Sequence, residues 1–203
     1  MKPAFIDGAV EKVGASREVM EKFWTELEDF ASYCFNKSHA ACYGLIAYWT
    51  AYLKAHYPDA YMAALMTSDS DNTDRLTIEI TECKKLGLQV VCPDINESFN
   101  EFAVVPGTNK IRFGLGAIKG VGGTAIEDIL AKKKDGPFES LEDFAKRVNS
   151  RVCNRKVYES LIKAGAFDCF QLKNPLPNGF IGSRSDLLFN LDSIIAFAQK
   201  YQK

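Results

Sequence analysis

The sequence has little of what most catalytic and metal sites are built from. It contains two histidines, His39 and His56, and no Gly-x-Ser-x-Gly motif, so no nucleophile and base pair stands out. Its six cysteines never occur at the short spacing of a zinc knuckle or a redox pair. These absences predict no bound metal and no catalytic residue. The cysteines lie mostly among apolar residues, which predicts buried free thiols in a reducing compartment.

Long apolar runs are also missing. No stretch is long enough to span a bilayer, and the first residues do not form an apolar leader before a small-residue cleavage site. We therefore expect a cytoplasmic protein with no membrane partner. The formal net charge of -1 gives no nucleic-acid signature for the chain as a whole.

The charge is nevertheless distributed unevenly. Residues 1–109 carry 9 basic and 16 acidic side chains, whereas residues 110–173 carry 13 basic and 8 acidic ones. A ligand that bears phosphates is therefore expected to contact the segment 110–173. With 203 residues and 47% hydrophobic content, the chain can also bury a substantial core.

Apolar residues recur every three to four positions in several segments, which is typical of amphipathic helices. The pattern predicts helices over 16–33, 38–56, 58–66, a segment after Asn72, 124–130, 140–148, 154–164 and 185–199. Ser38, Asn72, Ser140 and Asn154 are the expected N-caps of their helices. Short strands are predicted over 88–91, 101–105 and 110–115. The expected fold class is therefore mainly α with a small antiparallel β element (α+β).

A glycine-rich stretch before one predicted helix is the most informative local feature. Gly120 and Gly122 enclose Val121 in a tight turn that opens onto the helix, and Lys119 precedes it. Unpaired N–H groups at a helix start suit a phosphate, and glycine lets another backbone approach closely. The stretch does not complete a Walker A loop or a Rossmann fingerprint. An ordinary glycine turn remains the alternative.

A basic run follows this turn. It consists of Lys146, Arg147, Arg151, Arg155 and Lys156 without an intervening acidic residue. Such a run is often a solvated helix end, but placed beside the glycine turn it would strengthen a phosphate site.

A third feature lies at the start of the predicted helix 38–56. Asn36, Lys37, Ser38 and His39 concentrate polar donors at a helix start, which suits an anion. Tyr43 follows one turn later and could stack on a base. A structural, hydrogen-bonded role for His39 is the alternative.

Several longer stretches resemble the alpha (polymerase) subunit family of bacterial DNA polymerase III, the C-family replicative polymerases. The resemblance runs from about residue 5 to residue 168. It is carried by Phe5-Ile6-Asp7-Gly8-Ala9, Phe35-Asn36-Lys37-Ser38-His39-Ala40-Ala41, Leu53-Lys54-Ala55-His56-Tyr57-Pro58, Cys92-Pro93-Asp94-Ile95-Asn96, Arg112-Phe113-Gly114-Leu115-Gly116-Ala117-Ile118-Lys119-Gly120-Val121-Gly122 and Leu161-Ile162-Lys163-Ala164-Gly165-Ala166-Phe167-Asp168.

The resemblance implies three regions. Residues 1–95 would be the later part of the fingers domain, with nucleotide-facing helices, and residues 169–203 a linker and a last helix. Residues 96–168 would hold the β element and a tandem helix-hairpin-helix unit. In that unit Gly120-Val121-Gly122 is the first hairpin, and the region of Ala164-Gly165-Ala166 is a degenerate second copy.

The resemblance also implies site residues. Asn36, Lys37, Ser38, His39 and Tyr43 would contact the incoming deoxynucleoside triphosphate. Duplex DNA (primer-template) would be bound without sequence preference by Lys119, Gly120, Val121, Gly122, Arg147, Arg151, Arg155 and Lys156.

For the longer protein, the resemblance implies a DNA-directed DNA polymerase, a nucleotidyltransferase active in DNA replication. Its partners would include the sliding clamp and other replisome subunits. Mg²⁺ is expected there, held by palm carboxylates outside this chain, so no cofactor is expected here and the chain alone is expected to be inactive. The alternatives are a helix-hairpin-helix module of a nuclease or ligase, and a non-catalytic helical protein-interaction domain.

Overall fold

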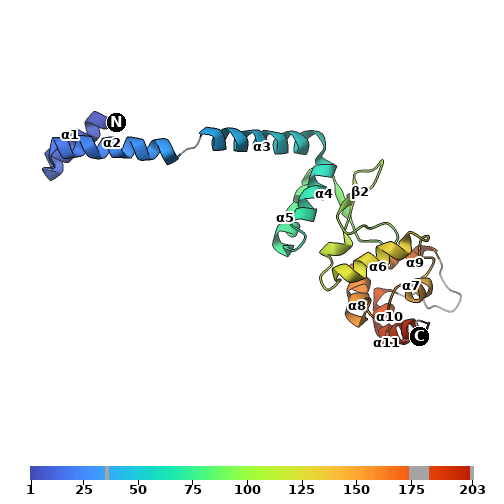
Figure 1. Ribbon diagram of the computed structural model, residues 1–203. Coiled ribbons are helices and arrows are strands. Elements are labelled where there is room, and N and C mark those ends of the chain that lie inside the picture. The colour runs from blue at the N-terminus through green and yellow to red at the C-terminus, as the bar shows by residue number, and fades with distance from the viewer. Residues whose placement is uncertain (35–36, 174–182, 202–203) are drawn as a thin grey trace. The chain divides into compact units, whose positions relative to one another are not determined.

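The computed structural model describes residues 1–34, 37–173 and 183–201 (Figure 1). The chain forms two compact units, Met1–Leu53 and Lys54–Lys203, and the long helix α3 (Lys37–His56) contains the point of division. These units do not coincide with the three sequence regions 1–95, 96–168 and 169–203, which stay a prediction about domains of the longer protein.

The first unit begins with two helices that pack on each other. Helix α1 (Lys2–Val13) ends at Gly14, whose φ of 71° forms a left-handed cap, and α2 (Arg17–Cys34) follows. The ring of Phe5 lies 5.3 Å from that of Trp24, measured between centroids. The sequence pattern predicted α2 but not α1, because Pro3 and Gly8 weaken the helical signal.

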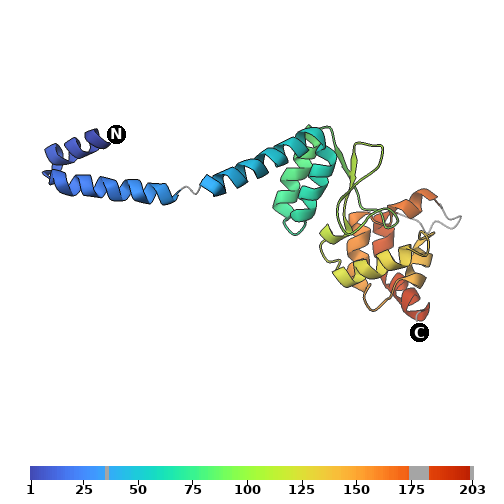
Figure 2. The same ribbon diagram turned by 45° about the horizontal axis from the view of Figure 1, so that its top comes forward.

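The second unit opens with a pair of helices, α4 (Pro58–Ser68) and α5 (Thr73–Lys85), which lie side by side in Figure 2. The side-chain oxygen of Asn72 accepts a hydrogen bond from the Arg75 N–H, as expected of an N-cap. Met62 and Met66 from α4 and Cys83 from α5 are fully buried between these helices and the sheet.

The sheet has three short strands in the order β1-β3-β2: β1 (Gln89–Val91), β2 (Ala103–Val104) and β3 (Lys110–Arg112). Strands β2 and β3 form an antiparallel hairpin, but β1 pairs with β3 in parallel. The expectation of a wholly antiparallel element was therefore wrong for β1. The chain from 92 to 102 crosses to β2 at the end of the sheet where β1 finishes and leaves a place for β3 between the two strands. Strand β2 therefore runs opposite to β1, and the hairpin returns β3 in the same direction as β1.

The remaining helices enclose a second core. They are the 3-10 turn η1 (Leu115–Ala117), α6 (Gly123–Lys133), α7 (Leu141–Arg147), α8 (Arg155–Ala164), α9 (Asp168–Lys173), α10 (Arg184–Phe189) and α11 (Leu191–Tyr201). Phe144, Tyr158 and Phe167 meet edge-on or tilted at its centre, with ring centroids 5.0 to 6.2 Å apart. Ser140 and Asn154 cap α7 and α8 as predicted.

The last predicted helix, 185–199, is divided in two. Helix α10 ends at Phe189, and the backbone N–H of its C-cap residue, Asn190, donates to the Asp186 carbonyl. Helix α11 begins directly after Asn190. The division lets Leu187 and Leu191 both enter the core. The apolar period alone did not reveal it, since the period continues across the break.

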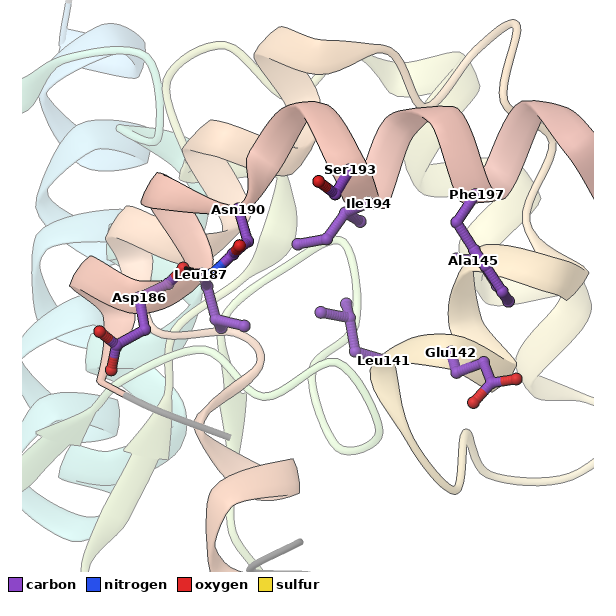
Figure 3. A pocket seen from close by; sticks show the side chains of 9 residues that line it. All are labelled: Leu141, Glu142, Ala145, Asp186, Leu187, Asn190, Ser193, Ile194 and Phe197. Carbon is purple, nitrogen blue, oxygen red and sulfur yellow. Dashed lines mark hydrogen bonds between the residues drawn. The ribbon is translucent and has the colours of Figure 1, made fainter. Parts of the chain in front are cut away.

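An apolar hollow of about 260 Å³ separates α7 from α10 and α11 (Figure 3). Leu141 points into it from α7, opposite Leu187 and Ile194. None of the residues predicted to bind DNA or nucleotide is among the described residues that line it. We regard it as part of the packing between these helices.

In the described part of the chain, no helix combines the length and apolar character needed to cross a membrane.

The sequence analysis predicted mainly buried thiols. Cys83 and Cys153 are buried, whereas the prediction is wrong for Cys42 and Cys92, which are exposed.

Candidate nucleic-acid interface

The first glycine turn is a tight hairpin between η1 and α6. The Val121 N–H donates to the Ile118 carbonyl at 3.1 Å, which closes the turn, and Gly120 has a φ of 95°. Val121 is 8% exposed and anchors the turn in the core. Only glycine adopts the left-handed conformation at Gly120 without strain, so this residue type is required for the turn.

The start of α6 leaves backbone donors open. Gly122 is the N-cap and makes no side-chain cap, while its carbonyl accepts hydrogen bonds from Ala125 and Ile126. Within the described residues, the N–H groups of Gly122, Gly123 and Thr124 donate to no backbone carbonyl. A Cβ added at Gly122 or Gly123 would meet nothing within 4 Å. Donors with open space in front of them suit a phosphate oxygen.

The hairpin lies directly against α8. A Cβ on Gly120 would lie 2.6 Å from Ser160 Oγ and 3.3 Å from Lys156 Cε. Lys119 and Lys156 are both exposed. The structure therefore places one residue of the predicted basic run, Lys156, beside the glycine hairpin.

Arg147, in contrast, points into the protein. Its guanidinium donates to the carbonyls of Gly136 at 2.8 Å and Pro137 at 3.2 Å, and also to the Lys132 carbonyl. It lies 4.5 Å from the centroid of the Phe138 ring. These contacts join the end of α6 to α7, so Arg147 has a structural role that its place in the basic run did not suggest.

The other members of the run differ in their surroundings. Arg155 forms an ion pair with Asp192 on α11, and Lys146 forms one with Glu142 at 2.8 Å. The hydrogen bond with Glu142 raises the pKa of Lys146. Arg151 is exposed, and no ion pair of its side chain occurs within the described ranges.

The second hairpin, between α8 and α9, is filled by an arginine. Gly165 has a φ of 87°, and a Cβ there would lie 2.6 Å from Arg184 Cζ. Arg184 donates to both carboxylate oxygens of Asp168, at 3.0 and 3.1 Å, and to the Lys163 carbonyl at 3.2 Å. The bond with Asp168 raises the pKa of Arg184. The two hairpins are therefore not equivalent, because a guanidinium group occupies the second one.

The candidate nucleotide contacts lie at the start of α3. The helix begins at Lys37, so Ser38 is within its first turn and is not the predicted N-cap. The rings of His39 and Tyr43 are 4.2 Å apart, one turn from each other as expected. Lys37, Ser38, His39 and Tyr43 are all exposed, and Asn36 lies outside the described residues.

Three residues with a part in these hairpins were not predicted from the sequence. Ser160 and Arg184 reach the glycine turns from helices 40 and 19 residues further along the chain, counted from the numbering. No local motif marks them. Thr124 could have been found, because it directly follows the glycine turn at a helix start.

The strongly perturbed groups near the hairpins belong to the core. Burial raises the pKa of Cys153 to about 12 and also raises the pKa of Tyr158. Neither group lies in an open site, so neither has the setting of a catalytic residue. Across 1–34, 37–173 and 183–201, no three His, Cys, Asp or Glu side chains meet as a metal site.

Two hairpins, each joining helical segments and resting on one hydrophobic core, define a helix-hairpin-helix protein. A family model for the helix-hairpin-helix motif matches residues 87–175, which contain both turns.

Comparison with curated proteins identifies the family more closely. The chain is 48% identical to the DNA polymerase III subunit alpha of Saccharopolyspora erythraea over 156 residues, or 76% of this chain and 13% of that protein. For the same subunit of Campylobacter jejuni, identity is 45% over 84% of this chain and 14% of the relative. For the same subunit of Borreliella burgdorferi, identity is 43% over 96% of this chain and 16% of the relative. The chain belongs to the DNA polymerase III alpha subunit family and spans about one seventh of the length of these relatives.

Proposed function

We propose that this chain is a segment of a replicative DNA polymerase and that its first hairpin binds the backbone of duplex DNA without sequence preference. The observation that carries the proposal is the open start of α6 beside Gly120, with Lys119 and Lys156 next to it. Backbone N–H groups would hold a phosphate oxygen, and the two lysines would add attraction to the DNA.

The surroundings of the hairpin favour one direction of approach. Val121 and Gly123 also line a polar hollow of about 380 Å³, together with Asp71 and Glu101. Carboxylates repel a phosphate, so we propose that DNA reaches the hairpin from the side of Lys119 and Lys156. We propose that the exposed Arg151 also contacts DNA, whereas the inward contacts of Arg147 and the ion pair of Arg155 leave these two residues with a smaller part in binding.

We further propose that Lys37, His39 and Tyr43 contact the incoming deoxynucleoside triphosphate in the longer protein. The first turn of α3 presents an exposed lysine and imidazole at a helix start, and the Tyr43 ring packs on His39. The sliding clamp and other replisome subunits are proposed partners of that protein, and the cytoplasm its location.

Mg²⁺ would be needed for nucleotide transfer in the longer protein. The described residues hold no cluster of three candidate ligands, so they do not fit a metal site, and we assign no step to a metal in this chain. We propose that the chain alone does not extend a primer. Incorporation of labelled nucleotide by the purified chain with Mg²⁺ would contradict this.

The DNA proposal is tested by fluorescence anisotropy with a short labelled duplex at several salt concentrations. We expect the logarithm of the affinity to fall linearly with the logarithm of the salt concentration, by about one unit of slope for each phosphate contacted. Gly122→Val should weaken binding about tenfold, because the added methyl groups stand in front of the open N–H donors.

The matched control is Gly8→Val on α1, where an added Cβ also meets nothing within 4 Å. It should leave DNA affinity unchanged. Salt-independent binding, or equal affinity for the Gly122 variant and the control in folded protein, would instead support an ordinary glycine turn. A helix-hairpin-helix module of a nuclease or ligase would show the same DNA binding but no effect of α3 on nucleotide use.

A further inference from the structure

Helices α10 and α11 pack against the other helices of the second core and belong to it. Leu187 from α10 and Leu191 from α11 are buried in the same cluster as Tyr158 from α8. In Figure 3 the side chain of Phe197 extends from α11 towards Ala145 on α7. Because their apolar residues fill the core, α10 and α11 are fixed parts of the fold and not a lid. Their other side chains reach three features that the sequence analysis connected with phosphate or DNA binding.

The first of these features is the second hairpin, which Arg184 from α10 occupies. Its guanidinium pairs with Asp168, whose carboxylate would otherwise repel a phosphate. The N–H groups of Gly165, Ala166 and Asp168 donate to backbone carbonyls at 2.9 to 3.1 Å. The charge of Arg184 and these three backbone donors are therefore engaged within the protein, in contrast to the open donors at the start of α6.

The second feature is Arg155, the first residue of α8. It forms an ion pair with Asp192 on α11, and both side chains are exposed. Arg155 directly precedes Lys156, which lies against the first hairpin, so a duplex bound at that hairpin would pass close to the ion pair. A paired carboxylate cancels much of the attraction between an arginine and a phosphate. Asp192 thus withholds from DNA a positive charge that lies near the proposed contact.

The third feature is Lys146 on α7. Its Nζ lies 5.7 Å from the centroid of the Phe197 ring and 5.0 Å from that of the Tyr201 ring, both on α11. The two rings also pack on each other, with centroids 4.6 Å apart. An ammonium group is attracted to the faces of aromatic rings. Together with the ion pair to Glu142, these rings hold Lys146 against the protein.

We propose that α10 and α11 confine duplex DNA to the first hairpin, an inference that rests on the DNA binding proposed above. The two helices occupy the second hairpin and hold the side chains of Lys146 and Arg155. Lys119 and Lys156 remain available at the first hairpin, because within 1–34, 37–173 and 183–201 neither side chain pairs with an acidic residue or an aromatic ring. A unit with two hairpins therefore presents one of them to DNA.

The experiment measures duplex affinity by fluorescence anisotropy for two variants that each remove one negative charge from these helices. Asp192→Asn frees Arg155. Asp186→Asn on α10 is the matched control, because Asp186 is exposed and forms no ion pair within the described residues. We expect Asp192→Asn to bind DNA about threefold more tightly and to raise the salt slope by about one unit, because Arg155 gains a phosphate contact. Asp186→Asn should stay within about 1.5-fold of the original chain.

The gain should depend on Arg155. Adding Arg155→Ala to Asp192→Asn should return the affinity to that of the original chain, since the freed guanidinium is then absent. An exposed ion pair contributes little to stability, so these variants should remain folded, with circular dichroism as the check. Equal affinity of the Asp192→Asn and Asp186→Asn proteins would overturn the proposal. So would a gain that persists without Arg155.

The second hairpin is tested in the original chain, without a variant. An NMR titration with duplex DNA should shift the amide signals of Gly122 and Gly123 and leave those of Gly165 and Ala166 in place. Equal shifts at the two hairpins would also overturn the proposal. Failure of the DNA-binding function itself has a different result, since the chain then binds no duplex or Gly122→Val binds as tightly as its control. DNA binding that depends on Gly122 but not on Asp192 rejects only the confinement by α10 and α11.

Discussion

Gly120 packs so closely on Ser160 that a Cβ atom at Gly120 would lie 2.6 Å from Ser160 Oγ. The contact joins the turn before α6 to the middle of α8 and sets the position of the hairpin. Two separate constraints therefore require glycine at this position, the φ of 95° and the closeness of α8.

Gly120→Ala should destabilise the fold by about 2 kcal/mol or more, because the left-handed conformation alone costs about 1 kcal/mol for alanine and the close contact adds to it. Urea unfolding followed by circular dichroism measures the change. Ser160→Ala alone should cost less than about 0.5 kcal/mol. Combining Ser160→Ala with Gly120→Ala should recover the part due to the contact, because it removes the Oγ that the added Cβ would meet. No recovery would show that this contact contributes nothing to the effect.

Substitution of Arg147 should mainly reduce stability, whereas substitution of Arg151 should mainly reduce DNA affinity. Arg147→Ala removes a guanidinium that donates to three backbone carbonyls, so we expect a loss of about 2–4 kcal/mol in the free energy of unfolding. Arg151→Ala removes the same charge from an exposed position and should leave stability within about 0.5 kcal/mol. It should lower DNA affinity and reduce the salt slope by about one unit.

Arg147→Lys should not restore the stability lost in Arg147→Ala, because an ammonium group cannot donate to the same carbonyls as the planar guanidinium group. Equal stability of the Arg147→Ala and Arg151→Ala proteins would contradict the structural role of Arg147.

Glu79 should make stability depend on pH. Its side chain is 6% exposed, its Oε2 lacks a hydrogen-bond partner among described residues, and burial followed by the hydrogen bond with Asp69 raises its pKa to about 7. The ordinary value is 4.5, so between these two values the folded state binds more protons than the unfolded state. Stability should therefore fall as the pH rises through this window.

Glu79→Gln should flatten that dependence and leave the variant more stable than the original protein at about pH 8, by on the order of 1 kcal/mol. Urea unfolding at about pH 5 and about pH 8 makes the comparison. The control is Glu127→Gln, an exposed carboxylate on α6, which should keep the original pH profile. A Glu79→Gln variant that is less stable at both pH values would show that the carboxylate is needed in its charged form.

The nucleotide contacts are best tested in the longer polymerase. Lys37→Ala or His39→Ala should raise the KM for deoxynucleotide or lower kcat by about ten- to a hundredfold, because each removes a donor from one anion site. Affinity for primer-template should change little. Tyr43→Phe is the control for ring packing, since it keeps the ring that lies on His39. Unchanged nucleotide kinetics together with weaker DNA binding would show that the first turn of α3 contacts the duplex and not the nucleotide.

The sequence by itself determined most of the local structure of this protein. The apolar period located the helices from α2 to α8 within a few residues, and Asn72, Ser140 and Asn154 cap the helices that they were predicted to cap. The turn at Gly120 and the resemblance to its family were also readable from the residues. These features depend on neighbours within one or two turns of the chain, so a local pattern is enough to specify them.

Only the tertiary structure decided the contacts that join distant segments. They include the parallel pairing of β1 with β3, the packing of Ser160 against the first hairpin, the position of Arg184 in the second hairpin and the inward direction of Arg147. Such contacts depend on how complete helices pack around a shared core, and no short-range periodicity records which side chain arrives at a given turn. The two glycine hairpins therefore present different surfaces, one with open backbone donors and one filled by a guanidinium group.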